Sequence, residues 1–420
     1  MVNPHVKREP SSTPAPSVAP VDRRFLLGGL AGVAGAATLA GLAKGGPLTP
    51  PAGGVSSTGK PIGELEPRRA VNSANIPASA TGLFRISQPG SYYLTANIDG
   101  VAGRNGVEIA SDNVTLDLNG FAVRGTGIGN GTLSGVTTAG QSLLENIVVR
   151  NGIVSGWGGN GVTLSGGGGT GVGGVIEDVT VIGNGARGIH ANGAAVVRRC
   201  TARLNVIAGI ALPSGGIVDS CVSQDNLGPG YELSVNIHAV GCVAAGNGDF
   251  GFSVQGSSLM ESCVARQNDS GGIDAGSGSR VTGCTVSGNG EAGISVTSGC
   301  AVVGNTVTAN TLFGITTLND CLIEGNQLDG HATACLRISG VDNRIHGNHC
   351  TDSGEGVSVT GTGNIITGNT CSGNGTNYFI DANNYYGAIV NRTGVLTASV
   401  NGSSATGTLA TADPHANFSF

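Results

Sequence analysis

The sequence predicts an all-β protein, a right-handed, single-stranded parallel β-helix (solenoid) with about 21 residues per rung and about thirteen rungs. Three observations predict this fold. Glycine makes up 75 of the 420 residues, which disfavours helices because each glycine costs a helix about 1 kcal/mol relative to alanine. Hydrophobic residues make up 39% of the chain and charged residues 11%, which is too apolar for a disordered protein. Several residue types also recur every 21 residues.

The repeat consists of three columns, one of cysteine, one of asparagine and one of glycine, each with a period of 21 residues. An apolar residue follows each glycine. After residue 300 the phase continues with other residue types, and the cysteine column becomes an asparagine column. The members are Cys200, Cys221, Cys242, Cys263 and Cys284, continued by Asn305, Asn326, Asn348 and Asn369; Asn184, Asn205, Asn226, Asn247, Asn268, Asn289 and Asn310, continued by His331, Ser353 and Asn374; and Gly188, Gly209, Gly230, Gly251, Gly272, Gly293 and Gly314.

Each repeat has room for three short strands and three turns, as in residues 280–294 (RVTGCTVSGNGEAGI). Each strand would pair with its copy one rung away at ~4.8 Å. Leucine-rich and helical repeats lack their required residues here, and a propeller blade needs roughly 40 residues. In-register stacking predicts that the corner asparagines bond to one another and that the cysteines point inward as free thiols. Disulfides between rungs are the alternative, disfavoured because parallel side chains do not converge.

The ends of the chain differ from the repeat. Arg23 and Arg24 precede a Gly/Ala-rich apolar run, which resembles a twin-arginine export signal. A membrane anchor is the alternative, but glycine and alanine are weak membrane formers. We therefore expect an exported protein, periplasmic or extracellular and on the cell surface, without a stable membrane anchor after signal cleavage. The expected parts are an export signal (1–45), a linker and N-terminal cap (46–80), the β-helix (81–395) and a C-terminal cap or tail (396–420).

The charges are scattered singly along the chain, with 21 basic and 27 acidic residues and a net charge of −6. No basic stripe is available to neutralise phosphates, so the sequence predicts no nucleic-acid partner. The oligomeric state stays open.

The columns and the opening phrases of the repeat, residues 86–98 (ISQPGSYYLTANI) and 113–121 (NVTLDLNGF), resemble the pectate-lyase-like right-handed parallel β-helix superfamily. The opening phrases resemble exported bacterial β-helix repeat proteins of undefined activity. The resemblance implies an asparagine ladder and a polysaccharide partner bound along one outer sheet. Calcium enters by family analogy only, and the residues themselves identify no cofactor. The catalytic motifs of polygalacturonases and pectate lyases are missing from the sequence.

Candidate site residues follow the repeated glycine, where every second residue of the strand should face solvent. Four of them are ionisable and are the catalytic candidates: His190, Glu232, Asp274 and Arg337. Glu232 and Asp274 would lie two rungs, or about 10 Å, apart, near the upper limit for the acid and base of an inverting glycosidase. The alternative is that these charges only keep the sheet soluble.

Two further residues are candidates for substrate binding. Gln255 would lie on the same face, and Trp157, the single tryptophan, could stack on a sugar or be buried beneath a loop. A second outward column has mixed signs and is predicted to be a surface charge pattern; it contains Glu177, Arg198, Asp219, Glu261, Glu324 and His346. No metal site is predicted.

Two functions therefore remain open from the sequence. The first is an exported protein that binds and cleaves polysaccharide in the manner of a glycoside hydrolase or a polysaccharide lyase. The second is a non-catalytic structural or adhesive rod on the cell surface. Spaced ionisable residues on one strand favour the first, and small Ser, Thr and Gly residues at most outer positions favour the second.

Overall fold

The structure is a computed structural model that describes residues 66–391 and 413–419, apart from residue 130 and the segments 140–143 and 166–172. The predicted export signal, with Arg23 and Arg24, lies outside the described residues. Within the described part of the chain, no helix has the length and the apolar character that a membrane crossing requires.

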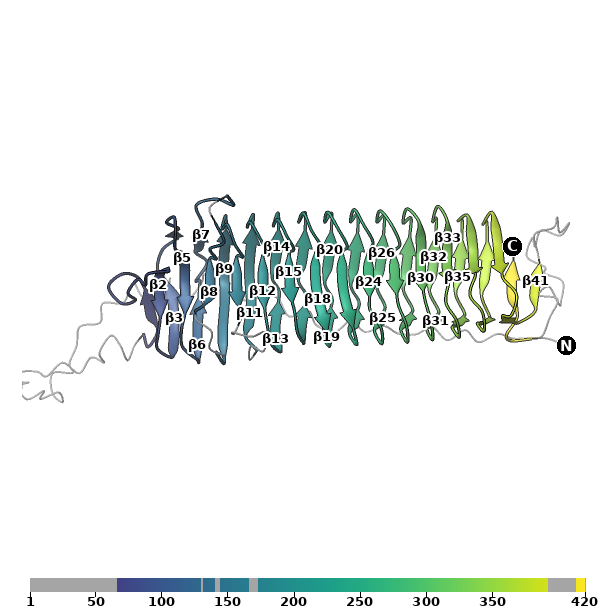
Figure 1. Ribbon diagram of the computed structural model, residues 1–420, viewed down its shortest axis with the longest axis horizontal. Helices are drawn as coiled ribbons and strands as arrows, with labels where there is room; N and C mark the ends of the chain where they lie inside the picture. The colour runs from purple at the N-terminus through teal and green to yellow at the C-terminus, as the bar shows by residue number, and fades with distance from the viewer. Residues whose placement is uncertain (1–65, 130, 140–143, 166–172, 392–412, 420) are drawn as a thin grey trace, which may run out of the picture. The chain divides into compact units, whose positions relative to one another are not determined.

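The described chain coils through 42 short strands in two parallel sheets, and successive coils lie side by side along the solenoid (Figure 1). One sheet, called sheet B here, takes one strand from each coil. Its fourteen strands are β2 (Gly82–Ile86), β5 (Asn105–Ile109), β8 (Val136–Thr138), β10 (Val162–Leu164), β12 (Ile189–Ala191), β15 (Ile210–Leu212), β18 (Tyr231–Val235), β21 (Phe252–Gly256), β24 (Ile273–Ala275), β27 (Ile294–Val296), β30 (Phe313–Thr317), β33 (Ala334–Ile338), β36 (Glu355–Val359) and β39 (Thr376–Ile380).

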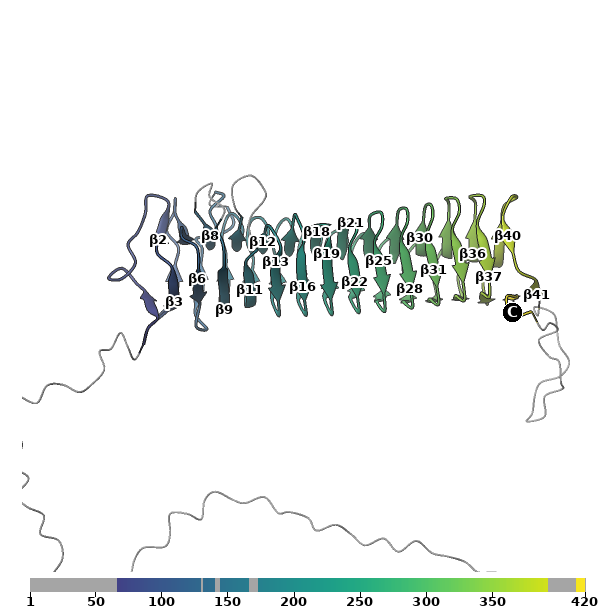
Figure 2. The same cartoon turned by 90° about the horizontal axis from the view of Figure 1, so that it is seen from below.

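The other sheet, sheet A, takes two strands from most coils. Figure 2 shows part of its first row, from β13 to β31, along one side of the solenoid. The first row contains β1 (Arg69–Val71), β3 (Gly90–Leu94), β6 (Val114–Asp117), β9 (Ile147–Ser155), β11 (Val175–Ile182), β13 (Ala195–Arg198), β16 (Gly216–Asp219), β19 (Ile237–Val240), β22 (Leu259–Glu261), β25 (Arg280–Thr282), β28 (Ala301–Val303), β31 (Leu322–Glu324), β34 (Arg344–His346), β37 (Ile365–Thr367) and β40 (Tyr385–Tyr386).

The second row of sheet A also includes the ends of the long strands β9 and β11, which span both rows. Its remaining strands are β4 (Ile98–Asp99), β7 (Ala122–Arg124), β14 (Thr201–Arg203), β17 (Val222–Gln224), β20 (Val243–Ala245), β23 (Val264–Arg266), β26 (Thr285–Ser287), β29 (Thr306–Thr308), β32 (Gln327–Asp329), β35 (His349–Thr351), β38 (Thr370–Ser372), β41 (Ile389–Asn391) and β42 (Asn417–Ser419). The all-β solenoid predicted from the sequence is confirmed.

The coils are not all of one length. Equivalent residues are 21 apart in the middle of the solenoid, as with Asn184 and Asn205. In the opening coils they are farther apart, as with Asn105 and Ser134, which are separated by 29 residues. Sheet B has fourteen strands in the described residues, in agreement with the predicted number of about thirteen rungs.

The asparagine column forms the predicted ladder at one corner of the solenoid. The side chain of Asn247, for example, donates from Nδ2 to Oδ1 of Asn268 at 2.9 Å and accepts from Nδ2 of Asn226 at 2.9 Å. The backbone N–H of Asn226 also donates to Oδ1 of Asn247, at 3.2 Å. In each of these bonds between ladder members the donor lies in the earlier coil and the acceptor in the later coil, while Nδ2 of Asn247 also donates back to the carbonyl of Ser223 at 3.2 Å. A ladder member therefore satisfies turn groups that the bend would otherwise leave unpaired.

The cysteine column lies at a second corner, where the side chains point inward. All ten cysteines are buried and have free thiols. Where the column changes to asparagine, side-chain bonding resumes, and Nδ2 of Asn305 donates to Oδ1 of Asn326 at 2.9 Å. The change of residue type therefore preserves the corner and replaces a thiol stack by an amide ladder.

A third corner column was not predicted from the sequence. Its backbone N–H groups donate to the side chain one coil later, from Ser258 to Ser279 at 3.3 Å and from Asn343 to Asn364 at 2.9 Å. The members are Ser258, Ser279, Cys300, Cys321, Asn343, Asn364 and Asn384. The column changes along the solenoid from serine to cysteine to asparagine, so no single residue type marks it in the sequence.

The C-terminal strand β42 lies between β38 and β41 in the second row of sheet A. Asn417 on this strand accepts the backbone N–H of Asn369 at 3.0 Å and its Nδ2 at 3.2 Å. The end of the chain therefore supplies the last acceptor of the amide ladder that begins at Asn305.

Candidate functional site

The outer column of sheet B places the four predicted catalytic residues in one row. His190 pairs in register with Ala211, Ala211 with Glu232, Glu232 with Ser253 and Ser253 with Asp274. Ser295 and Thr316 follow Asp274 in the same row, and Arg337 comes next. The predicted outward direction and the predicted order along the sheet are therefore both present.

A pocket of about 250 Å³ opens on this face over the coil of Ala211. The outward side chain there is a methyl group between two long side chains, so the column has a gap. The lining residues are Arg187, His190, Ala211, Pro213, Glu232, Leu233, Ser234, Ser253 and Gln255. The pocket thus brings together three of the predicted site residues: His190, Glu232 and Gln255.

Arg187 spans this gap and was not predicted as a site residue. Its Nε donates to Oε2 of Glu232 at 2.7 Å and its Nη2 to Oε1 at 3.0 Å, a bidentate ion pair that reaches across two coils. Arg187 precedes the repeated glycine, so it belongs to a different column from Glu232. The two residues are 45 positions apart in the sequence. Because arginine does not recur at this position of the repeat, the periodicity did not predict their contact.

His190 forms the opposite wall of the pocket. Burial of the ring and, to a lesser degree, the nearby Arg187 lower the pKa of His190, while Glu232 opposes the shift. The imidazole is therefore neutral at neutral pH. Its Nδ1 is buried and has no hydrogen-bond partner within the described residues.

Asp274 lies two coils beyond Glu232, which corresponds to about 10 Å along the sheet. Burial raises the pKa of Asp274, a hydrogen bond from Ser295 opposes the shift, and Glu291 adds to it. Glu232, by contrast, is held by the guanidinium of Arg187. A carboxyl group whose pKa is raised and a carboxylate held in an ion pair are the two kinds of partner that acid and base catalysis uses.

The other predicted residues lie in three different places. Gln255 lines the pocket, and its Oε1 accepts a hydrogen bond from Oγ of Ser234 at 2.8 Å. Arg337 lies three coils beyond Asp274 and donates to Oγ of Ser358 at 2.9 Å, so it is not part of the pocket. Trp157 lies in the core with 3% of its surface exposed and donates from Nε1 to the carbonyl of Val123. It therefore offers no ring face to a sugar.

The outer column of sheet B also extends toward the N-terminus, where it contains a buried charge that was not predicted. Glu108 is only 2% exposed. Its carboxylate accepts hydrogen bonds from Ser79 at 2.7 Å, Asn105 at 3.1 Å and Arg85 at 3.2 Å. Burial alone would raise the pKa of Glu108, but the bonds from Thr81, Ser79, Asn105 and Arg85 outweigh it and lower the pKa. This carboxylate fastens the N-terminal turn to sheet B.

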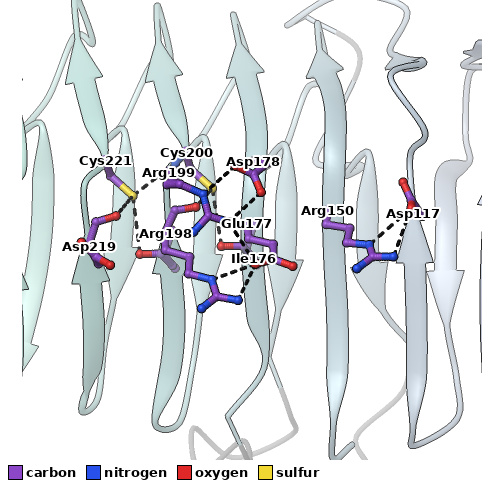
Figure 3. A network of polar contacts seen from close by, with 11 residues as sticks. Asp117, Arg150, Ile176, Glu177, Asp178, Arg198, Arg199, Cys200, Asp219 and Cys221 are labelled. Atoms are coloured by element: carbon purple, nitrogen blue, oxygen red, sulfur yellow. Dashed lines mark hydrogen bonds and ion pairs between the residues drawn. The ribbon is translucent and has the colours of Figure 1, made fainter. Parts of the chain in front are cut away.

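The second outward column, on sheet A, is a ladder of ion pairs (Figure 3). Arg150 contacts Asp117 at 3.3 Å, and Arg198 contacts Glu177 at 2.6 Å. Arg199, beside Arg198, also reaches Glu177. Five successive coils therefore alternate in charge, in the order Asp117, Arg150, Glu177, Arg198 and Asp219. Each charge is matched by its neighbours, as predicted for a surface charge pattern, and the column forms no concentrated field for a ligand.

Two family models match parts of the chain. One, described as a right handed beta helix region, matches residues 134–312, and one, described as a periplasmic copper-binding protein (NosD), matches residues 231–407. No curated protein matches the chain significantly.

The second description names copper, and a copper site would require several metal-ligating side chains that lie close together. Across residues 66–391 and 413–419, with the gaps given above, no group of three or more His, Cys, Asp or Glu side chains could hold a metal ion. His346, His349 and Cys350 are close in sequence, but Cys350 is buried in the core while His349 is exposed. Nδ1 of His346 contacts Thr367. The described residues therefore do not fit a copper site.

Among solved structures, the A-module of mannuronan C-5 epimerase AlgE4 from Azotobacter vinelandii is 16% identical, with a TM-score of 0.47, covering 70% of this chain and 90% of that one. The periplasmic alginate epimerase AlgG is 13% identical, with a TM-score of 0.39 and coverage of 76% and 82%. Pectate lyase Pel9A is 11% identical, with a TM-score of 0.26 and coverage of 71% and 78%. From its rows of parallel strands and the match of residues 134–312 to the β-helix model, the chain is a right-handed parallel β-helix.

Proposed function

We propose that the protein binds a polysaccharide along the outer face of sheet B and hydrolyses it there. The observation that carries this proposal is the pocket over Ala211, where His190, Arg187 and Glu232 surround a hollow that fits one sugar unit, with Asp274 farther along the same row. A flat row of strands offers an extended ligand a contact in each coil, and the pocket fixes which sugar unit of the ligand lies over which coil.

The division of roles follows from the surroundings of the two carboxyl groups. Asp274 is assigned as the general acid, since burial raises its pKa and so favours its protonated form. Glu232 is the general base, since Arg187 fixes its orientation while lone pairs of the carboxylate stay free. Asp274 would donate its proton to the bridging oxygen as the glycosidic C–O bond breaks. Glu232 would take a proton from the water that bonds to the anomeric carbon, which inverts that carbon at this separation.

The proposed place of action is outside the cytoplasm. The twin-arginine-like segment containing Arg23 and Arg24 predicts export, and one of the matching family models is described as periplasmic. The alginate epimerases and the pectate lyase among the similar structures are named for polysaccharide chemistry, which agrees with a polysaccharide ligand but is not the basis of the proposal.

The test is a panel of polysaccharides incubated with purified protein, with separate readouts for new reducing ends and for unsaturated products. Glu232→Gln and Asp274→Asn are each expected to lower turnover at least about a hundredfold while thermal stability changes little. Glu324→Gln on sheet A is the matched control, since it also lies in an outward column but far from the pocket. Unsaturated products would show that the reaction is an elimination and not a hydrolysis. Turnover that survives both substitutions would show that neither residue is the catalytic acid or base.

A second candidate function is a non-catalytic binding rod. It is favoured by the outer column beyond the pocket, where the side chains are mainly short and neutral, as in Ser295, Thr316 and Ser358. The rod predicts that wild-type protein binds a polysaccharide and releases no product from any member of the panel. The same substitutions would then change affinity only modestly.

A further inference from the structure

The charges in the pocket over Ala211 bear on which class of sugar it accepts; this inference rests on the function proposed above. Among the described residues that line the pocket, Arg187 is the only one with a permanent positive charge. Its Nε and Nη2 already donate to the two oxygens of Glu232. A carboxylated sugar that took the same bidentate contact would have to displace Glu232 from Arg187, and the displaced carboxylate would be left without its partner.

The other ionisable wall of the pocket also disfavours an anion. His190 is half-buried beside Arg187, and both influences lower its pKa, so that the ring is neutral at neutral pH. A neutral imidazole can exchange a hydrogen bond with a hydroxyl group, whereas it has no charge with which to compensate a carboxylate.

The surroundings of the pocket along the sheet are acidic. Asp274 forms no ion pair with any described residue, and Glu291 is near enough to raise its pKa further. A polymer with one carboxylate per sugar unit would bring further negative charge close to Glu232 in the pocket and to Glu291 near Asp274. In a region partly shielded from water, like charges in such proximity oppose binding.

The remaining lining is neutral and divides into two kinds of contact. Ala211, Pro213 and Leu233 offer C–H groups to the face of a sugar ring, and Ser234, Ser253 and Gln255 offer hydroxyl and amide groups to its hydroxyls. These are contacts that every unsubstituted hexose or pentose can make.

The geometry points to an uncharged sugar unit in this pocket, so that the ligand is a neutral polysaccharide and not a polyuronate. The bidentate pair of Arg187 and Glu232 is the element that sets this preference, because it occupies the one cation that a uronate would need. Selectivity would then come from a contact made within the protein in the absence of ligand.

The experiment measures affinity for a neutral set (galactan, mannan and xylan) and an acidic set (polygalacturonate and alginate). Wild-type protein is expected to bind a member of the neutral set, with less than about a twofold change in affinity between about 20 mM and about 500 mM NaCl. Ala211→Trp fills the pocket and is expected to weaken this binding at least about tenfold. Thr282→Trp on sheet A is the matched control and should leave binding unchanged.

A gain of function tests the role of the ion pair directly. Glu232→Gln frees the guanidinium of Arg187 and is expected to raise affinity for the acidic set about tenfold in low salt, and the double variant with Arg187→Gln should lose that gain. Wild-type protein that prefers the acidic set, with Ala211→Trp abolishing that binding, would overturn this inference and leave the proposed site standing. Binding of either set that is insensitive to Ala211→Trp would overturn the proposed site, and this inference with it.

Discussion

Replacing Asn247 by alanine tests whether the amide ladder stabilises the solenoid. Asn247 lies in the middle of the ladder and its side chain is fully buried. The substitution removes the acceptor of the Asn226 backbone N–H, at 3.2 Å, and of Nδ2 of Asn226, at 2.9 Å. Nδ2 of Asn226 keeps Oγ of Ser223 as a partner, but the backbone N–H has no other hydrogen bond to take.

The magnitude follows from that count. One buried backbone donor left unpaired costs about 1–3 kcal/mol. The backbone N–H of Asn247 itself still bonds to Asn268 at 3.1 Å. The loss of Nδ2 also removes hydrogen bonds to the carbonyl of Ser223 at 3.2 Å and to Oδ1 of Asn268 at 2.9 Å, but an acceptor that loses one donor costs less than an unpaired backbone N–H. We therefore expect the free energy of unfolding to fall by about 2 kcal/mol, which corresponds to about thirtyfold faster amide exchange in the turn around Asn226.

The assay combines guanidinium unfolding followed by circular dichroism with hydrogen exchange read by mass spectrometry. Exchange is needed because solenoids do not always unfold in a single step. The matched control is Gln327→Ala, which removes an exposed amide side chain on an outer strand and should change stability by less than about 0.5 kcal/mol. Equal losses in the two variants, or unchanged exchange around Asn226, would refute the role assigned to the ladder.

Four further outcomes are expected. Because the folded-state pKa of Glu108 is below its unfolded value of 4.5, its contribution to stability is present above that value and is lost as the pH falls through the lowered pKa; Glu108→Gln should flatten this acid limb in melting curves. Turnover should decline on the alkaline side as Asp274, whose pKa is raised, loses its proton, and Asp274→Asn should abolish that limb in a pH-rate profile. All ten buried thiols should resist a thiol reagent until denaturant is added, whereas labelling in the native state would contradict their burial. Replacing Arg23 and Arg24 by lysine should hold the precursor in the cytoplasm, and fractionation that finds normal export would exclude the twin-arginine interpretation.

The sequence predicted the regular part of the fold because in-register stacking requires chemically similar residues at equal spacing. The asparagine ladder and the cysteine column are direct consequences of that requirement. The third corner column escaped because serine, cysteine and asparagine all accept a backbone N–H there, as Ser279 and Asn364 do. The opening coils escaped because turns of variable length keep no period.

The candidate site was predicted in part for the same reason. The alternation of one strand placed His190, Glu232 and Asp274 on the outer face, as the register shows. Strand alternation says nothing about long side chains that reach across coils, so Arg187 was missed. The sequence analysis left two positions open for Trp157, one binding a sugar and one buried. Its burial depends on Gly106 and Gly135, because a Cβ atom at either position would collide with the indole ring. No local sequence pattern reports such packing.

The direction of the amide ladders has a consequence for the order in which the protein can be completed during synthesis. Each turn amide donates to a side chain that belongs to the coil made next. A coil emerging from the ribosome is therefore incomplete until its successor has been made, and each new coil finishes the one before it. The terminal acceptor for Asn369 is Asn417, 48 residues later. A chain shortened before Asn417 would therefore leave the backbone N–H of Asn369 without this acceptor.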